Sequence, residues 1–185
     1  MIRRECREQE SINYFIKSKK AGNSDLLCDQ FLTGVGEAEH QVEKIFLGEC
    51  KIYPCIGCYA CSRLGECFKK DNANKILEKM VDSDVIVLGA PVYFYSVCSQ
   101  LKMLIGRTFP KYQGIRYKEF YFILTAADTS MENMQRTLKC LRGFTFCLDG
   151  AVEKGIIYGL GVHEKGKIKN KPAIMKQAYN MGTNV

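Results

Sequence analysis

Short apolar segments alternate with segments of helical periodicity along this chain. The first pair is residues 12–16, an apolar and β-prone run, followed by a stretch in which Leu27, Phe31 and Val35 recur at helical spacing. Strands that alternate with helices pair in parallel and are covered on both faces, because each crossover returns the chain to the same edge of the sheet. The pattern therefore predicts an α/β fold with a doubly wound parallel sheet.

Four more strands complete the predicted sheet. The strongest is residues 85–88 (VIVL), a continuous apolar run typical of a strand buried on both faces. In doubly wound sheets ligands bind outside the carboxyl ends of the strands, so we expect the site in the loops after Ile16, Leu88 and Thr125. The other strands are expected at residues 42–47, 120–125 and 155–158, and the helices at about 76–81, from Ser96, over 131–147 and from Pro172.

The chain shows no internal repeat or linker. Its 185 residues, 46% apolar and 25% charged, have the composition of a single globular domain over residues 1–185. Residues 1–11 are too charged for a signal peptide and are expected to form a disordered stretch ahead of the folded part. The longest apolar runs fall far short of the ~20 residues that a bilayer crossing needs. We therefore expect a soluble, cytoplasmic protein without a membrane partner.

The formal net charge is +7, with a basic run at Lys17, Lys19 and Lys20. Charge alone does not predict nucleic-acid binding, and these basic residues are neither interleaved with aromatic ones nor part of a recognition motif. We expect no nucleic-acid partner. The charge fits either a solvated basic surface or an anionic cofactor.

The loop KSKKAGNS joins the first strand to the first helix. Ser18, Lys19, Asn23 and Ser24 supply hydroxyl, ammonium and amide donors around a turn at Gly22, and the helix that follows has an N-terminus that attracts anions. These four residues are therefore candidates for binding a phosphate group. An ordinary helix cap beside solvated lysines is the open alternative.

The loop after the third strand, APVYFYS, is rich in aromatic residues. A planar heteroaromatic ring would gain dispersion energy from such side chains, and backbone amides of the turn could bond its polar edge. The alternative is that Phe94 and Tyr95 fill the core beneath the loop. The candidate ligand-binding residues here are Pro91, Val92, Tyr93, Phe94 and Ser96.

A cysteine-rich loop is expected over residues 50–70. Cys55, Cys58, Cys61 and Cys67 follow the spacing C-x2-C-x2-C-x5-C. Three cysteines at successive x2 spacing resemble the wrapping of a [4Fe–4S] cluster, whereas structural zinc sites more often use two separated pairs. A cluster, a zinc ion and free or oxidised thiols all stay open, with these four residues as the candidate metal ligands.

Four isolated cysteines fall on predicted helix faces. Free cysteine behaves as a small apolar residue and is often buried, so we expect these four to pack in the core. They are Cys28, Cys98, Cys140 and Cys147.

Several motifs in order along residues 12–165 resemble one family. The stretches are AGNSDLLCDQF, CIGCYACSRLGEC, ILEKMVDSDVIVLGAPVYFYSV, QLKMLIGRTF and EFYFILTAADT. The chain resembles the flavodoxin-related NAD(P)H-dependent FMN reductases and, among them, the iron–sulfur flavoprotein branch. The resemblance implies a flavodoxin-like three-layer sandwich with a five-stranded parallel sheet in the order 2-1-3-4-5, and assembly into a homodimer or homotetramer.

The resemblance also implies where FMN binds. Its phosphate would lie at the first loop, and its isoalloxazine ring would lie against residues 91–96. Family members usually begin the phosphate loop with Gly-Ser where this chain has Ile16 and Lys17, which predicts weaker FMN binding. The other side of the ring would be lined by Thr125, Ala126, Ala127 and Asp128.

The expected function is that of an FMN-dependent oxidoreductase. FMN would take hydride from NAD(P)H and reduce flavin, a quinone or another small acceptor, with a [4Fe–4S] cluster as a further electron carrier. No side chain is then needed as an acid or base, and His40 and His163 are expected to be structural or exposed. Two alternatives stay open: a non-catalytic electron-transfer flavoprotein, and a metal- or redox-sensing protein.

Overall fold

A computed structural model of the chain describes residues 12–17, 21–36 and 41–185. Ser18 and Lys19, two of the expected phosphate-binding residues, lie outside the described residues, as do His40 and the expected disordered stretch over residues 1–11.

Five parallel strands form the centre of the molecule, in the order β2-β1-β3-β5-β6. A sixth strand, β4, pairs with β3 in the antiparallel direction. The sheet is therefore mixed, and the expectation of a purely parallel five-stranded sheet is wrong in this respect. The strands are β1 (Ile12–Lys17), β2 (Gln41–Phe46), β3 (Val85–Tyr93), β4 (Ser96–Val97), β5 (Glu119–Thr125) and β6 (Val152–Gly159).

The strand β3 runs further than expected. Pro91 lies within it, opposite Thr125 of β5, while the pairing of β3 with β1 ends at Gly89. The missing amide of Pro91 therefore costs no bond to β1, and a proline is tolerated here. A two-residue turn, Phe94–Tyr95, then leads into β4, so the predicted helix start at Ser96 is wrong and the helix α4 (Ser99–Gly106) begins three residues later.

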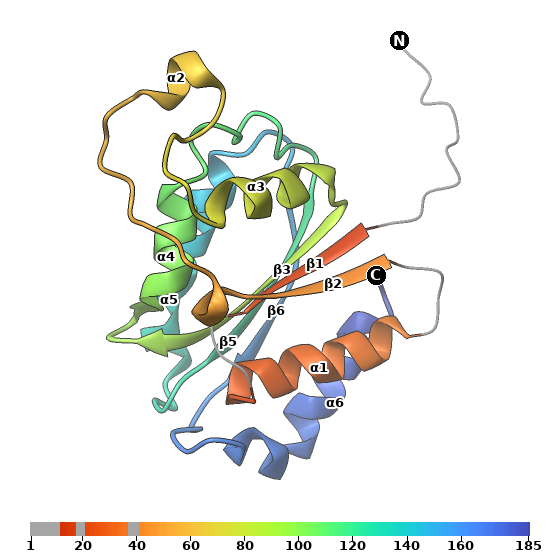
Figure 1. Cartoon of the computed structure of the whole chain (residues 1–185). Helices are drawn as coiled ribbons and strands as arrows, with labels where there is room; N and C mark the ends of the chain where they lie inside the picture. Colours follow the sequence, from red (N-terminus) through yellow and green to blue (C-terminus); the bar gives the residue numbers. More distant parts are fainter. Residues whose placement is uncertain (1–11, 18–20, 37–40) are drawn as a thin grey trace.

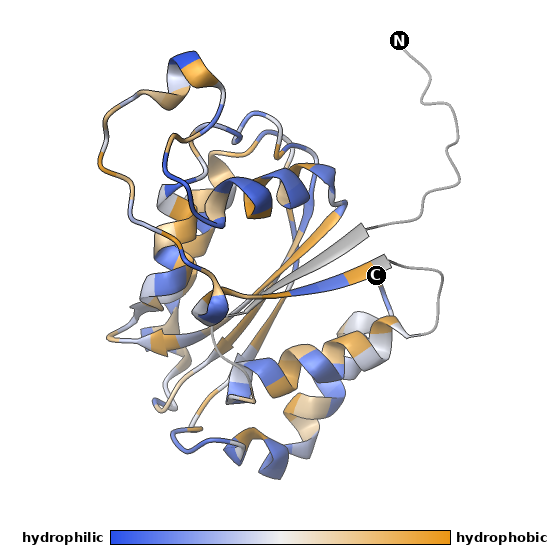
Figure 2. Cartoon of the chain, viewed as in Figure 1, coloured by the Kyte–Doolittle hydropathy of each residue, from blue (hydrophilic) through white to orange (hydrophobic). Residues whose placement is uncertain are grey.

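Helices cover both faces of the sheet and make a three-layer sandwich (Figure 1). One core cluster joins the sheet to α1 (Asn23–Val35) and α6 (Pro172–Gly182), and the other joins it to α3 (Ala73–Asp82), α4 and α5 (Met131–Phe146). Figure 2 shows hydrophobic residues along the strands and hydrophilic ones over much of α3. No helix in the described ranges is long and apolar enough to cross a membrane. A short helix, α2 (Cys61–Leu64), and 3-10 turns at Leu47–Glu49 and Lys167–Asn170 lie in the connections.

Two glycines allow α1 and α6 to pack backbone against backbone. A Cβ atom built on Gly34 would lie 1.9 Å from the carbonyl oxygen of Tyr179, and one built on Gly182 would lie 2.0 Å from that of Phe31. No side chain fits at either position without moving a helix.

The isolated cysteines divide into two groups. Cys28 and Cys98 are 0% and 1% exposed, which confirms that they pack in the core. Cys140 is half-buried, and Cys147 is exposed, so its predicted burial is wrong. Cys147 lies just after α5, where its Sγ donates to the Gly143 carbonyl at 3.4 Å.

Candidate functional site

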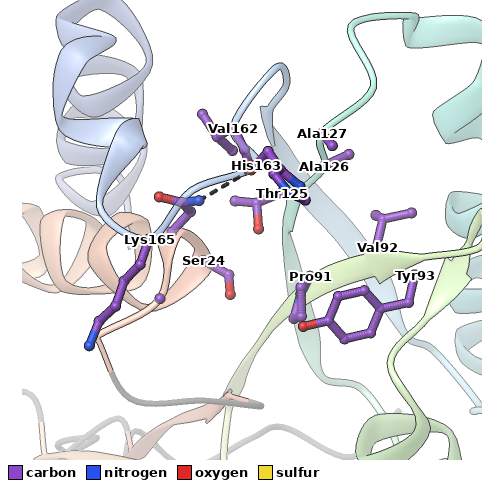
Figure 3. A pocket seen from close by; sticks show the side chains of 12 residues that line it. Ser24, Pro91, Val92, Tyr93, Thr125, Ala126, Ala127, Val162, His163 and Lys165 are labelled. Atoms are coloured by element: carbon purple, nitrogen blue, oxygen red, sulfur yellow. Dashed lines mark hydrogen bonds between the residues drawn. The ribbon is translucent and has the colours of Figure 1, made fainter.

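A cavity of about 310 Å³ opens at the carboxyl ends of the parallel strands (Figure 3). Figure 3 shows Ser24 and Lys165 on one side, Pro91 and Tyr93 on the other, and Thr125 between them. Eight of the residues expected to bind FMN lie around it, namely Asn23, Ser24, Pro91, Val92, Tyr93, Thr125, Ala126 and Ala127. The fold thus brings three separate segments of the sequence to one site.

The N-terminus of α1 forms one end of the cavity. Gly22 is its N-cap and carries no side chain to satisfy the amides of the first turn. Asp25 instead takes the Ala21 amide at 2.6 Å, and Ser24 is nearly buried at 4% exposure. An uncapped helix N-terminus with its positive dipole end facing a cavity is suited to an anionic group.

Asn23 does not act as the sequence suggests. Its Nδ2 donates to the carbonyls of Val162 and Glu164 at 3.2 and 2.9 Å, and its Oδ1 accepts from the Ile168 amide at 3.2 Å. The side-chain amide is fully engaged, so only the backbone of Asn23 is available to a phosphate. The side chain fastens the loop after β6 to the start of α1.

That loop supplies residues that the sequence analysis missed. Val162, His163 and Lys165 line the cavity together with Gly22. The available signal was topological: β6 is parallel to the other four strands, so its carboxyl end reaches the same edge. His163 is exposed, as expected, but it faces the cavity.

The loops after β5 and β6 hold each other in place. The Val162 amide donates to the Ala126 carbonyl at 2.9 Å, and the Gly161 amide donates to the Asp128 carbonyl at 3.0 Å. Gly161 has a φ of 67°, a left-handed conformation that other residues adopt only with strain. The Gly159-Leu160-Gly161 segment therefore forms a turn at the cavity rim.

An apolar slot forms the other end of the cavity. Its lining comes from neighbouring strands, with Pro91 and Val92 in β3 and Thr125, Ala126 and Ala127 at the end of β5 and directly after it. Four of these five side chains are apolar and Thr125 adds one hydroxyl, a mostly apolar lining of the kind expected around a planar ring. The geometry at this end is therefore suited to a flat heteroaromatic group.

The aromatic turn is exposed and does not fill the core. Phe94 is fully exposed and Tyr95 is 42% exposed, which rules out the alternative that both pack beneath the loop. Phe94 and Asp128 lie outside the main cavity and line an adjoining hollow of about 260 Å³ with Tyr95 and Met134. Ser96, which begins β4 and pairs with Tyr93 of β3, lines neither space.

Asp128 holds this turn. Its carboxylate accepts from the Ser130 amide at 2.7 Å, Asn133 Nδ2 at 2.9 Å and the Tyr95 hydroxyl at 3.0 Å. These donors lower the pKa of Asp128, and the same contact raises the pKa of Tyr95. Arg136 lies 5.5 Å from the centre of the Tyr95 ring. An ionised, saturated carboxylate is a structural anchor here and not a proton donor.

The four clustered cysteines lie on a segment that projects from the sandwich and carries α2 (Figure 1). Cys55 and Cys58 are exposed, Cys61 and Cys67 are half-buried, and all four are free thiols. The Gly57 amide donates to the Sγ of Cys55 at 3.4 Å, the type of bond that stabilises metal-bound thiolates.

The donors fit an iron–sulfur cluster in number and chemistry. In the part of the chain that the structure describes, however, no three candidate ligands lie close enough together to hold a metal ion. The segment would have to draw its sulfurs together on binding, as metal-coupled loops do. The metal site stays a prediction.

Comparison with known proteins identifies sequence relatives over most of the chain. Residues 14–154 match the family model described as NADPH-dependent FMN reductase. An iron–sulfur flavoprotein of Methanocaldococcus jannaschii is 37% identical over 171 residues, which cover 89% of each chain. An iron–sulfur flavoprotein of Archaeoglobus fulgidus is 40% identical over 86 residues, covering 46% of this chain and 42% of the relative.

Solved structures share the fold at lower sequence identity. An NAD(P)H:quinone oxidoreductase from Methanothermobacter marburgensis superposes with a TM-score of 0.74 at 13% identity, covering 94% of this chain and 96% of the other. An FMN-dependent NADH-azoreductase from Bacillus anthracis, solved with FMN, gives 0.73 at 12% identity, covering 94% and 98%. These likenesses confirm a flavodoxin-like α/β fold.

Proposed function

The chain belongs to the NADPH-dependent FMN reductase family, in its iron–sulfur flavoprotein branch, and from this premise we propose how its residues hold FMN and what they reduce. Membership makes the protein an NAD(P)H-dependent oxidoreductase that uses FMN. The observation that carries the rest of the proposal is the cavity itself, in which an uncapped helix N-terminus and an apolar slot face each other. Those are the two environments that a phosphate and a flavin ring require.

The FMN phosphate is proposed to bind at the start of α1. The backbone amides of the first turn and the Ser24 side chain would donate to it, and Lys165 would add a positive charge from the loop after β6. Lys165 and His163 would then compensate for the Gly-Ser pair that this chain lacks at Ile16 and Lys17. The isoalloxazine ring would lie in the slot between Pro91–Val92 and residues 125–127.

When bound, FMN supplies hydride acceptance from NAD(P)H and electron transfer to an acceptor. The protein's part is to orient the ring, neutralise the phosphate and shield one ring face from water. Its acidic and tyrosyl groups at the rim, Asp128 and Tyr95, are bonded to each other and hold the turn. At this rim both groups are thus placed to hold the turn and not to act as a general acid or base.

The acceptor is proposed to be a small planar molecule such as a quinone or a free flavin. The hollow walled by Phe94 and Tyr95 adjoins the main cavity and shares Val92, Ala126 and Ala127 with it. Aromatic walls of this kind favour stacking with a flat acceptor.

A [4Fe–4S] cluster is proposed on Cys55, Cys58, Cys61 and Cys67, the four thiols of one projecting segment. A reducing compartment such as the cytoplasm would keep these thiols available to iron.

Assembly into a homodimer or homotetramer is also proposed. Large apolar side chains are exposed away from the cavity, among them Phe109 at 49%, Phe146 at 91% and Tyr59 at 72%. Exposed apolar groups of this size often mark an interface between subunits. The molar mass in solution, measured by light scattering, would equal that of one chain if the proposal is wrong.

Reduction by NAD(P)H under anaerobic conditions tests the enzymatic assignment. We expect the visible flavin absorption of the purified protein to bleach on adding NADH or NADPH, and to return on adding a quinone. If dithionite bleaches the flavin but neither nucleotide does, the result favours the alternative of a non-catalytic electron-transfer flavoprotein. A colourless protein that fails to bind added FMN would instead favour the sensing alternative.

Replacing Lys165 with methionine tests the phosphate site. We expect FMN to bind about fivefold more weakly, since an exposed charge contact is worth about 1 kcal/mol, and riboflavin to bind as before because it has no phosphate. Lys167→Met is the matched control: Lys167 lies two residues away, pairs with Glu164 at 3.6 Å and does not line the cavity. Fluorescence titration of both flavins measures the difference. An equal loss for riboflavin would place Lys165 at the ring or the fold, not at the phosphate.

A further inference from the structure

The cysteine segment leaves the sandwich and returns to it through a narrow neck, formed by residues 51–54 on one side and residues 69–72 on the other. The Asn72 amide donates to the Lys51 carbonyl at 2.8 Å, and the Lys51 amide donates to the Oδ1 of Asn72 at 2.7 Å. The two chain segments of the neck are therefore held side by side. All four candidate cluster ligands lie between them.

Arg107 reaches the neck from a distant part of the sequence. Its Nη1 donates to Asp71 Oδ2 at 2.6 Å and to the Tyr53 carbonyl at 2.7 Å, and its Nη2 donates to Asp71 Oδ1 at 3.2 Å. Tyr53 and Asp71 belong to the two opposite segments of the neck, so one guanidinium is hydrogen-bonded to both. The Arg107 and Asp71 side chains are 1% and 0% exposed.

This pair is costly to disturb because it is shielded from water. Burial by itself would raise the pKa of Asp71, but hydrogen bonds from Arg107, Tyr53 and Ala73 outweigh burial and lower the pKa. Removing one partner of such a pair leaves a buried charge uncompensated, whereas the intact pair adds little over an apolar one. Among the described residues Arg107 Nε has no partner, so the neck alone orients the guanidinium. The Arg107–Asp71 pair therefore fixes the position of the neck more than it adds to the free energy of unfolding.

The stretch of chain that ends in Arg107 also connects the neck to the candidate flavin site. Arg107 directly follows α4, and α4 follows the turn between β3 and β4 at the cavity rim. We propose that Arg107 is a positioning residue, which sets the place of the four thiols relative to the flavin cavity by holding Asp71 and Tyr53. The redox consequence rests on the proposed function, in which those thiols carry a cluster.

The test compares Arg107→Lys and Asp71→Asn with Arg142→Lys in freshly purified anaerobic protein. Arg142 is the matched control, because it forms a similar two-bond pair with Glu153 in an exposed position. We expect Arg107→Lys to release iron to a chelator about tenfold faster, as loss of a residue that orients metal ligands does, with unchanged FMN affinity. Amide hydrogen exchange over residues 51–72 should be faster in both neck variants and unchanged in the control.

Iron release and exchange at wild-type rates in Arg107→Lys would overturn the inference, because the neck would then hold without this residue. Parallel losses of FMN and iron would overturn it too, since they mark a general contribution to the core. Asp71→Asn keeps the shape of the side chain and one acceptor oxygen. It must show the same faster amide hydrogen exchange in the neck even if the Arg107 variant fails to fold. If wild-type protein holds FMN but no iron, the proposed cluster is wrong, while the exchange data still decide the role of Arg107.

Discussion

Replacing Gly34 with alanine is expected to lower the free energy of unfolding by about 2 kcal/mol. The added methyl group would lie 1.9 Å from the Tyr179 carbonyl oxygen, which belongs to a helix backbone and cannot rotate away. Overpacking of this kind costs about 3 kcal/mol. The higher helix propensity of alanine returns only about 1 kcal/mol. The clash therefore outweighs the gain, and α1 and α6 must separate.

Thermal unfolding measures this loss, and Gly143→Ala is its control. Gly143 also lies in a helix, but a Cβ atom there meets no other atom within 4 Å, so only the propensity gain applies. In a domain of this size we expect the melting temperature to fall by about 4–8 °C for Gly34→Ala and to rise slightly for Gly143→Ala. A stabilising effect at both positions would mean that α1 and α6 lie further apart than the structure shows.

Replacing Cys58 with serine is expected to abolish the iron–sulfur cluster and leave the flavin in place. A cluster of this type needs four thiolates, and a serine hydroxyl is a poor ligand for its iron. The flavin should stay because the cavity shares no residue with the cysteine segment. Bleaching by NAD(P)H should therefore persist, while electron transfer through the cluster is lost.

Iron, acid-labile sulfide and FMN per chain, counted anaerobically, measure the outcome. We expect about four irons in wild-type protein, almost none in Cys58→Ser and about four in Cys147→Ser. Cys147 is the control because it is also an exposed cysteine but lies just after α5 and is not one of the four cysteines of the segment. Equal iron content in both variants would exclude Cys58 as a ligand. One zinc ion per chain in wild-type protein would show that the four cysteines form a zinc site and not a cluster site.

The strands were predictable because their signal is local. The apolar run at residues 85–88 and the aromatic run at residues 120–125 carry their burial in their own composition, and both are strands in the structure. β4 was not predictable in this way. Its turn places Phe94 and Tyr95 at φ values of 49° and 56°, where sequence patterns favour asparagine or glycine. Contacts elsewhere, such as the bond from Tyr95 to Asp128, hold that turn.

The candidate site divides in the same manner. The sequence predicted the residues of the apolar slot in two ways, because Pro91 and Val92 come shortly after a predicted strand and the family resemblance implied residues 125–127. The hydrogen bonds of the Asn23 side chain could not be predicted from the sequence, because its partners lie 139 to 145 residues further along the chain. Lys165 was missed for the same reason, since nothing in its own surroundings marks it as part of a loop that reaches α1.

The sequence by itself determined the alternating α/β order, the family and the four-cysteine segment, because side-chain periodicity and motif spacing are properties of neighbouring residues. Only the tertiary structure decided which loops meet at the cavity, that Asn23 fastens one of them and that Arg107 grips the neck of the cysteine segment. Those contacts join residues far apart in the chain, and they exist only once the sheet has brought the carboxyl ends of its strands to one edge and the helices have packed against its faces.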